Sequence, residues 1–391
     1  MENYIPKIRF KGTYDENGKW VEFTHPWEQR KLGEMVIDHN AGIYISKEDY
    51  GEGTNVIGVG NIYDRDIFDG EIYRLGPVND DKFILEENDI IYGESSLVPE
   101  GIARTVCVGK NGAGSAFAWH TRRVKLDKNI VNSHVATLEL NYLHEIRKYL
   151  VSVSTQTALT GMTTEGYFGA TLTLPSVEEQ QVISDYFKNI DHLITLHQRK
   201  CDLYQQAKQS MMEKLFSNNV DWEEKQLGKI LIRNPKSNIG VHETQQMKSG
   251  DIQYFTSGEK IFYINDFLVK GENIFVNDGG VADIKYYNGK ANYSDHILSL
   301  KNIDNSICLQ FVYQSLLSKI KIINDKLFHG LGLKNLSKKD FMNFIISIPD
   351  IEEQIKIANM LSKYDELIAI SKNQLNTLQT LKKGLLQQMF V

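Results

Sequence analysis

The sequence predicts an α+β protein made of two mixed α/β domains, each followed by a long helix, with the second half repeating the first. Three observations lead to this expectation. The block PSVEEQQVISDYFKNIDHLI, which starts at Pro175, returns as PDIEEQIKIANMLSKYDELI, which starts at Pro349. Trp-Glu followed by Leu-Gly occurs at Trp27 and again at Trp222. The stretches between these motifs have the β-branched runs and the Gly, Asn and Asp turns that are typical of strands.

The internal repeat extends over both ends of each half. Residues 170–217 align with 344–391 without a gap, and 11 of these 48 positions are identical. The Trp-Glu motif recurs after 195 residues and the Pro motif after 174, so the second body is 21 residues shorter. A tandem duplication with variable middles accounts for both spacings.

The repeated ends predict two helices of the coiled-coil type. Ser176 and Asp350 suit the N-cap position, and a glutamate follows three residues later in each copy, as in a capping box. Beyond them, apolar residues advance in steps of four and three, which indicates a seam between paired helices. The seam positions are Ile183, Phe187, Ile190, Ile194, Tyr204, Met211 and Leu215 in the first copy and Ile357, Leu361, Tyr364, Ile368, Leu375, Leu378 and Leu385 in the second. So long an apolar stripe is unfavourable in water, and we expect each helix to bury its stripe against a partner helix.

Polar residues interrupt the seam at matching positions. Lys208 corresponds to Lys382, and His197 corresponds to Ser371. A polar residue in a seam can specify the register of pairing at some cost in stability, so we interpret these residues as alignment devices and not as catalytic groups.

The expected organisation follows from these motifs. It comprises an N-terminal arm at 1–26, a first domain at 27–174, a first spacer helix at 175–217, a linker at 218–221, a second domain at 222–348 and a second spacer helix at 349–391. Within the domains, helical spacing predicts one further helix from Leu138 and one from Gln310.

The composition bounds the class of protein. A hydrophobic content of 41% is ordinary for a folded chain, and the three cysteines show no metal-binding or disulfide spacing. No signal peptide and no run of about 18 apolar residues is apparent, so we expect a soluble cytoplasmic protein without a membrane partner. The formal net charge of -6 is unlike that of most nucleic-acid binders.

Catalytic motifs are missing from the sequence. The seven prolines never stand adjacent, which excludes the Pro-Pro loop of common DNA amino-methyltransferases, and no glycine-lysine pair completes a phosphate-binding loop. The glycines at Gly112 and Gly114 fit a plain turn better than a nucleotide loop. The Glu-x-Lys ending at Glu223 to Lys225 coincides with the repeated domain start, so a nuclease site is not indicated there. We therefore expect that the chain is not an enzyme.

Both halves resemble the specificity subunit of type I restriction-modification systems. The resemblance rests on WEQRKLGEM and its echo WEEKQLGKI, on the duplicated P-x-x-EEQ blocks, and on the helix ends KQSMMEKLF and KKGLLQQMF. It implies two target recognition domains, which read the two halves of a split, asymmetric DNA site, and two antiparallel helices that act as a spacer with a pseudo-two-fold relation. It also implies double-stranded DNA, two modification methyltransferase subunits that methylate adenine, and restriction motor-nuclease subunits as partners. The seam positions of the two helices are then assigned to partner docking as well as to pairing. S-adenosylmethionine, ATP and magnesium are then expected in the partner subunits and no cofactor in this chain.

Candidate DNA-binding residues lie in basic and aromatic stretches of the variable middles. They are Arg104, Trp119, His120, Arg122, Arg123 and Lys125 in the first domain, and Lys285, Tyr286, Tyr287, Lys290, His329, Lys334, Asn335 and Lys338 in the second. Lysine and arginine neutralise phosphates, while arginine and asparagine also read base edges. The first domain is acidic, with 14 Lys and Arg against 21 Asp and Glu, so its DNA contact must be local.

Two other interpretations remain open from the sequence. A scaffold of duplicated modules that binds proteins or glycans would also suit the acidic first domain. A catalytic nuclease or methyltransferase would require activity from the chain alone, despite the missing motifs. A gel shift with the methyltransferase partner, and activity assays with magnesium or S-adenosylmethionine, separate the three.

Overall fold

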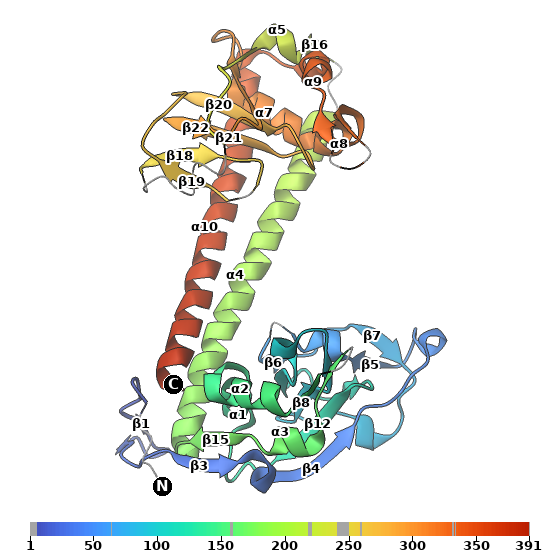
Figure 1. Ribbon diagram of the computed structural model, residues 1–391, viewed down its shortest axis with the longest axis vertical. Helices are drawn as coiled ribbons and strands as arrows, with labels where there is room; N and C mark the ends of the chain where they lie inside the picture. The colour runs from blue at the N-terminus through green and yellow to red at the C-terminus, as the bar shows by residue number, and fades with distance from the viewer. Residues whose placement is uncertain are drawn as a thin grey trace. The chain divides into compact units, whose positions relative to one another are not determined.

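The fold was obtained as a computed structural model that describes residues 6–63, 65–156, 159–217, 221–240, 250–258, 260–330, 332 and 334–390. The chain forms two compact units (Figure 1), one of residues 1–196 with 375–391 and one of residues 197–374. The start of the predicted arm, residues 1–5, and most of the predicted linker, residues 218–220, lie outside the described residues.

The first unit contains most of the strands. Its elements are β1 (Gly12–Tyr14), β2 (Trp20–Glu22), β3 (Glu28–Lys31), β4 (Val36–Ala41), β5 (Thr54–Ile57), β6 (Ile67–Phe68), β7 (Arg74–Gly76), β8 (Ile90–Gly93), β9 (Ser95–Ser96), β10 (Thr105–Val108), β11 (Ala116–Phe117), β12 (Thr121–Leu126), α1 (Ser133–Tyr142), α2 (His144–Val153), β13 (Thr155–Gln156), β14 (Thr160–Gly161), α3 (Thr164–Phe168), β15 (Thr171–Leu174) and the first part of α4 (Val177–Ser217). A short 3-10 helix, Leu32–Met35, follows β3.

The second unit repeats much of this order. Its elements are β16 (Glu223–Gln226), α5 (Leu227–Ile230), β17 (Leu231–Arg233), β18 (Ile252–Phe255), β19 (Phe262–Ile264), β20 (Glu272–Asn277), β21 (Ile284–Asn288), β22 (Ala291–Tyr293), β23 (Ile297–Asn302), α7 (Leu309–Ser318), α8 (Ile320–Leu327), β24 (Phe328–His329), β25 (Asn335–Leu336), α9 (Lys338–Asn343), β26 (Ile345–Ile348) and the first part of α10 (Ile351–Met389). The last part of α10 belongs to the first unit.

The sheets of the two units correspond strand by strand. The first has the order β4-β12-β8-β10-β6 and the second β17-β23-β20-β21, so β6 is an additional edge strand of the first unit. A parallel pair accompanies each sheet, β11 with β5 and β22 with β18. The strand pair that joins the start of each domain to its end has the same register in both, because Glu28 pairs with Leu174 and Glu223 pairs with Ile348. The internal repeat predicted from the sequence is therefore confirmed.

The repeated Leu-Gly motif has a packing reason. A Cβ on Gly33 would lie 3.2 Å from the Cβ of Phe168, and one on Gly228 would lie 3.1 Å from the carbonyl oxygen of Met342. Phe168 and Met342 occupy matching positions near the end of each domain. Each glycine thus allows the start of its domain to lie close against the end.

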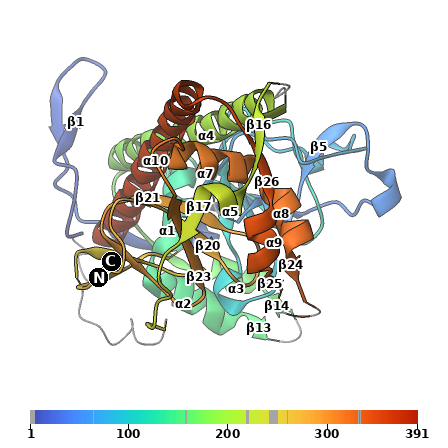
Figure 2. The ribbon, with the colours of Figure 1, turned by 90° about the horizontal axis from the view of Figure 1, so that it is seen from above.

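The long helices begin where the sequence predicts. The peptide N–H of Glu179 donates to Ser176 Oγ at 3.3 Å, and that of Glu353 donates to Asp350 Oδ1 at 2.9 Å. Both caps satisfy an N–H group that has no partner within the helix. In the first unit the start of α4 and the end of α10 lie side by side and run antiparallel (Figure 1). In the view from above, α10 again lies beside α4 (Figure 2).

The single helix predicted in each domain is wrong in detail, because each is divided in two. The first begins at Ser133, where Asn132 caps the N–H groups of His134 and Val135, and ends at Tyr142. Leu143 is extended, and the chain turns there into α2. This turn brings the Arg147 guanidinium to the carbonyl oxygen of Ile102 at 2.6 Å. The second domain has the same division between α7 and α8.

Candidate nucleic-acid interface and helix seam

The glutamine of each EEQ motif ties the long helix to its own domain. Gln180 Nε2 donates to the carbonyl oxygen of Pro175 at 2.9 Å, and its Oε1 accepts from the N–H of Asn132 at 2.7 Å. Gln354 Nε2 donates to the carbonyl oxygen of Pro349 at 2.9 Å, and its Oε1 accepts from the N–H of Cys308 at 2.9 Å. Asn132 and Cys308 are the N-cap residues of α1 and α7. The motif therefore fixes the first turn of a spacer helix against the first turn of a domain helix.

The lysines of the seam form ion pairs with the aspartates of the opposite copy. In the first unit, Lys382 Nζ on α10 lies 2.6 Å from Asp191 Oδ1 on α4. In the second unit, Lys208 Nζ on α4 lies 2.6 Å from Asp365 Oδ1 on α10. Asp191 corresponds to Asp365 in the repeat, as Lys208 corresponds to Lys382. The pairing is therefore reciprocal, as a pseudo-two-fold relation requires.

Each ion pair is also held by the domain beside it, and here the two units differ. In the first unit, Asp66 Oδ2 lies 2.5 Å from Lys382 Nζ, and Asp66 also accepts from Tyr142, Asn141 and Arg104. In the second unit, Gln314 Nε2 donates to Asp365 Oδ2 at 2.8 Å. A carboxylate of one domain and an amide of the other therefore hold the same helix, α10.

Burial and opposite charge set the ionisation of the first network. Burial alone would raise the pKa of Asp66, but Lys382, Arg104 and the hydrogen bonds outweigh it and hold that pKa below its ordinary value. Burial would lower the pKa of Lys382, but the carboxylates of Asp66 and Asp191 raise it above its ordinary value. Lys382 and Asp66 are therefore both charged at neutral pH, in a site almost closed to water.

The seam residues predicted for helix pairing are buried or half-buried. Phe187 and Leu361 are fully buried, and Ile183 and Ile357 lie in the cores of their units. The polar interruptions His197 and Ser371 also lie in the seam, where Ser371 is buried and His197 is half-buried. These residues line the helix pair, which agrees with a role in pairing, and their assignment to partner docking stays a prediction.

The chain ends meet in the first unit. The guanidinium of Arg9 binds both carboxylate oxygens of Glu179, at 2.8 and 2.7 Å, and Glu179 is fully buried beneath it. The ring of Phe390 packs on Trp27 with centroids 5.8 Å apart, and Phe216 packs on Trp222 at 6.1 Å. Phe390 thus brings the end of α10 against the start of the first domain, whereas Val391 lies outside the described residues.

The basic candidates of the first domain are largely paired with carboxylates. Arg122 pairs with Glu94, Arg123 Nη2 lies 2.5 Å from Asp38 Oδ2, and Lys125 Nζ lies 2.5 Å from Glu86 Oε1. Arg104 belongs to the Asp66 network. Arg123 is buried, while Arg122 and Lys125 on the same strand, β12, are half-buried. DNA binding by these four residues stays a prediction, and the structure gives each of them an internal partner.

The aromatic candidates of the first domain are accessible. Trp119 is half exposed, its ring lies 3.8 Å from the His120 ring, and Tyr44 packs against it edge-on at 5.4 Å. His120 has a φ of 65°, which is uncommon for a residue with a side chain and marks a constrained turn between β11 and β12. Tyr44 was not predicted from the sequence, because it lies far from Trp119 along the chain.

The candidates of the second domain fall into two groups. Lys285, Tyr286, Tyr287 and Lys290 belong to the β21 hairpin, where Lys285 Nζ donates to the carbonyl oxygen of Gly258 at 2.6 Å and Lys290 lies over the Phe267 ring. His329, Lys334, Asn335 and Lys338 belong to the hairpin β24–β25 and the start of α9. The structure brings the second group together with the turn after β20, where the N–H of Gly280 donates to the carbonyl oxygen of Lys334 at 2.8 Å.

Two residues beside this second group, Asp278 and His296, were not predicted from the sequence. Lys338 Nζ lies 2.9 Å from Asp278 Oδ2, and His296 Nδ1 lies 3.3 Å from Asp278 Oδ1. His296 is well exposed. The signal that would have found it is the alignment of β12 with β23, because His296 directly precedes β23 as His120 precedes Thr121 in β12.

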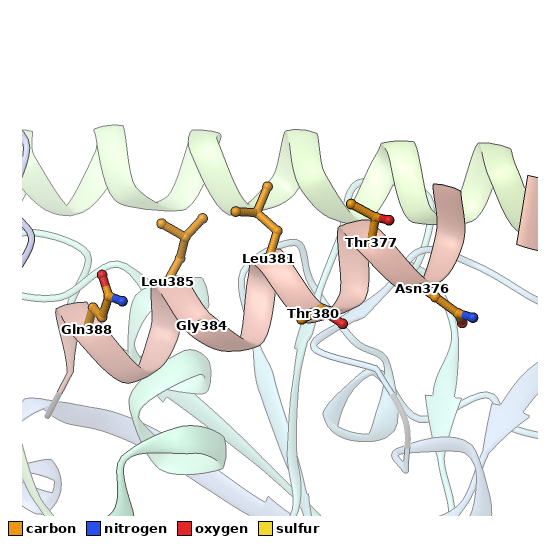
Figure 3. Close-up of a pocket in the computed structure, with 7 residues that line it drawn as sticks. All are labelled: Asn376, Thr377, Thr380, Leu381, Gly384, Leu385 and Gln388. Carbon is orange, nitrogen blue, oxygen red and sulfur yellow. The ribbon is translucent and has the colours of Figure 1, made fainter. Parts of the chain in front are cut away.

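A groove lies along the last part of α10 (Figure 3). It is lined by Asn376, Thr377, Thr380, Leu381, Gly384, Leu385 and Gln388. Leu381 and Leu385 project from the same side of the helix, and Gly384 leaves room between them. The lining combines two leucines with asparagine, threonine and glutamine side chains and contains no charged side chain.

In the part of the chain that the structure describes, no group of three or more His, Cys, Asp and Glu residues is placed to hold a metal ion. None of its helices has the length and apolar character needed to span a membrane.

Comparison with known proteins identifies the repeated unit. The family model described as the type I restriction modification DNA specificity domain matches residues 24–203 and again 219–380. The MjaX specificity subunit of a type I restriction enzyme from Methanocaldococcus jannaschii is 26% identical over 247 residues, or 54% of this chain and 56% of that protein. The MjaVIII specificity subunit of the same organism is 27% identical over 185 residues, or 44% of this chain and 42% of that protein. The chain thus spans about half the length of these relatives.

A solved structure shares the fold. The crystal structure of the S subunit of the type I restriction-modification system from M. genitalium superposes with a TM-score of 0.74, and the match covers 99% of each chain at 15% identity. At this identity the match speaks for the fold, which includes both mixed α/β domains and both long helices. Since two copies of the family domain together cover most of the sequence, the chain belongs to the family of type I restriction-modification specificity subunits.

Proposed function

We propose that this chain is the DNA-reading, non-catalytic subunit of a type I restriction-modification enzyme. Each recognition domain reads one half of a bipartite, asymmetric site in double-stranded DNA. The two helices set the gap between the half-sites and dock the modification subunits, which methylate adenine at N6, and the restriction subunits, which cleave. S-adenosylmethionine, ATP and magnesium act in those partner subunits.

The observation that carries this proposal is the reciprocal seam between two copies of one domain type. Lys382 pairs with Asp191 and Lys208 pairs with Asp365, so each copy of the helix meets the other copy in the same way. A protein with two-fold symmetry presents two equivalent reading surfaces to half-sites at a fixed spacing. Here the domains differ in sequence, so the half-sites differ as well.

Exposed apolar residues on both helices support docking of one modification subunit on each copy. Leu193 and Leu196 on α4 are 43% and 44% exposed, and the matching Leu367 and Ile370 on α10 are 38% and 53% exposed. Leu193 and Leu367 are among the identical positions of the repeat, although they lie outside the seam. Large apolar side chains at equivalent exposed positions are typical of a protein interface.

The internal pairing of the basic residues supports weak DNA binding by the chain alone. Arg122, Arg123 and Lys125 have carboxylate partners, so these three cations of β12 are not free to neutralise phosphates. Phosphate contacts supply most of the non-specific affinity for DNA. The partner subunits then contribute much of the affinity for the phosphate backbone, while this chain supplies the sequence preference.

Purification of the chain with and without its methyltransferase subunits tests the proposal. DNA binding is measured by fluorescence anisotropy over a range of salt concentrations, and methylated adenines are mapped on plasmid DNA. We expect weak binding by the chain alone, tight and salt-sensitive binding by the complex, and methylation at a split site with two unlike halves. Methylation at one continuous site, or tight specific binding without partners, would contradict the proposal.

A further inference from the structure

One turn occurs in both domains with the same hydrogen bond. In the first domain, the N–H of Glu94 donates to the carbonyl oxygen of His120 at 2.8 Å. In the second domain, the N–H of Asp278 donates to the carbonyl oxygen of His296 at 3.0 Å. Each acidic residue directly follows a central strand, β8 or β20, and each histidine directly precedes the neighbouring strand, β12 or β23. Glu94 and Asp278 therefore occupy one position of the fold, and His120 and His296 occupy another.

The backbone of this turn is held firmly in the first domain. The N–H of Trp119 donates to the carbonyl oxygen of Ile43 at 2.8 Å, and that of Thr121 donates to the carbonyl oxygen of Ala118 at 3.2 Å. The positive φ of His120 is kept in place by these bonds on either side. Side chains on a rigid turn lose little entropy on binding, which favours discrimination between similar ligands.

Each acidic residue orients a cation next to the turn. Glu94 pairs with Arg122, and Asp278 pairs with Lys338 and with the ring of His296. A carboxylate repels the phosphate backbone but accepts hydrogen bonds from the amino groups of bases, while arginine and lysine donate to guanine. A carboxylate beside a cation thus suits base edges in the major groove better than phosphates.

The exposed side chains on this shared frame differ between the domains. The first domain presents the apolar ring of Trp119, supported edge-on by Tyr44 at 5.4 Å. The second presents Asp295 and His296, which are 39% and 68% exposed. An apolar ring suits the methyl group of thymine, whereas a carboxylate suits the amino group of cytosine. The backbone hydrogen bond of the turn is the same in both domains, whereas the side chains that face solvent differ. This difference is expected where the turn encodes a sequence preference.

We propose that this turn, with Trp119, His120 and Glu94 in the first domain and Asp295, His296 and Asp278 in the second, is the base-reading element of each domain. The ligand is the base edge of duplex DNA. This inference rests on the proposed function, and it adds Glu94, Asp278, Asp295 and His296 to the residues that determine specificity.

The test uses the full chain assembled with its methyltransferase subunits and a plasmid library in which both half-sites are randomised. Trp119→Ala and His120→Asn alter the first turn, and asparagine tolerates the positive φ of that position. His296→Ala and Asp295→Ala alter the second turn. We expect methylation at one or more non-cognate bases to rise about tenfold relative to the cognate base, in one half-site for each turn, with the other half-site unchanged.

A matched control is Tyr14→Ala on the hairpin β1–β2. Tyr14 is also an exposed aromatic residue that packs edge-on, here against Trp20 at 5.1 Å, and its loss should leave both half-sites unchanged. Unaltered base preference in all turn variants, or an equal loss of methylation at both half-sites, would overturn the inference. If the unaltered complex methylates no split site, the proposed function itself is wrong.

Discussion

Gln180 and Gln354 make the same pair of hydrogen bonds in the two copies of the repeat. Each donates to a proline carbonyl five residues earlier and accepts from the N-cap N–H of a domain helix. Both glutamine side chains are buried. Removal of either one therefore deprives a proline carbonyl and the N–H of a helix N-cap residue of this hydrogen-bond partner. In both copies this glutamine joins the spacer helix to its recognition domain in the same way.

Gln180→Ala and Gln354→Ala should each lower the free energy of unfolding of the affected unit by about 2–3 kcal/mol, because buried peptide groups lose their hydrogen bonds. Urea unfolding measures this loss. Gln181→Ala, which alters the exposed neighbour, should cost about 0.5 kcal/mol or less. Equal effects of Gln181→Ala and Gln180→Ala would show that the buried bonds are not what holds the helix.

The two seam lysines should differ in importance. Lys382→Met leaves the carboxylate of Asp66 buried, and among the described residues the partly exposed Arg104 then remains as its cation. We therefore expect the free energy of unfolding of the first unit to fall by about 3 kcal/mol. Lys208→Met removes a pair whose aspartate is 40% exposed, so we expect about 1 kcal/mol or less. Chemical denaturation of both variants decides this, and a larger loss for Lys208→Met would contradict the role of the Asp66 network.

The buried carboxyl of Glu139 should make stability depend on pH. Burial raises the pKa of Glu139 to about 8, so the folded state holds its proton where an exposed glutamate would lose it. The stability due to this proton is complete below the ordinary glutamate pKa and falls as pH rises, by up to about 1.4 kcal/mol per pH unit, until about pH 8.

Glu139→Gln removes this titration while it keeps an oxygen that can accept from the N–H of Thr173. Unfolding measured from about pH 5 to about pH 8 should therefore show a smaller loss of stability in the variant than in the unaltered chain. The difference between the two proteins isolates Glu139, since Asp89, whose pKa burial raises to about 6, titrates in both. Parallel curves would mean that Glu139 does not titrate in this range.

The packing of Phe390 on Trp27 should contribute to the stability of the first unit. Phe390 is buried against Trp27, so Phe390→Ala should cost about 3–4 kcal/mol through the cavity that it leaves. Phe216, its counterpart in the repeat, is only half-buried against Trp222, and its replacement by alanine should cost less. Thermal unfolding with tryptophan fluorescence as the probe compares the two, and the reverse order would contradict this packing.

The sequence predicts the features that depend on the spacing of apolar residues along a helix and on the internal repeat. The caps at Ser176 and Asp350 and the apolar seam follow from local rules, because a helix face and its N-terminus are written within a few neighbouring residues. The contact between Asp66 and Lys382 joins residues 316 positions apart and has no local signal. The division of the domain helix at Leu143 depends on where Arg147 finds its acceptors, which is also a tertiary contact.

The sequence says less about the candidate site than about the fold, for a physical reason. Basic residues such as Arg123 look available in a sequence, yet a strand partner can place a carboxylate beside them. His296 was missed because a lone histidine between strands carries no pattern until its strand is aligned with that of His120. The repeat gives this alignment only after the strands themselves are known.

The proposal that each copy of the domain reads its own half-site is tested most directly by a chain in which both domains are the first one. Residues 27–169 replace residues 222–343, at borders that occupy matching positions of the repeat. If each domain reads its own half-site, the complex with methyltransferase methylates a split site whose second half is the inverted copy of the first. An unchanged, asymmetric site in the methylation map would contradict it.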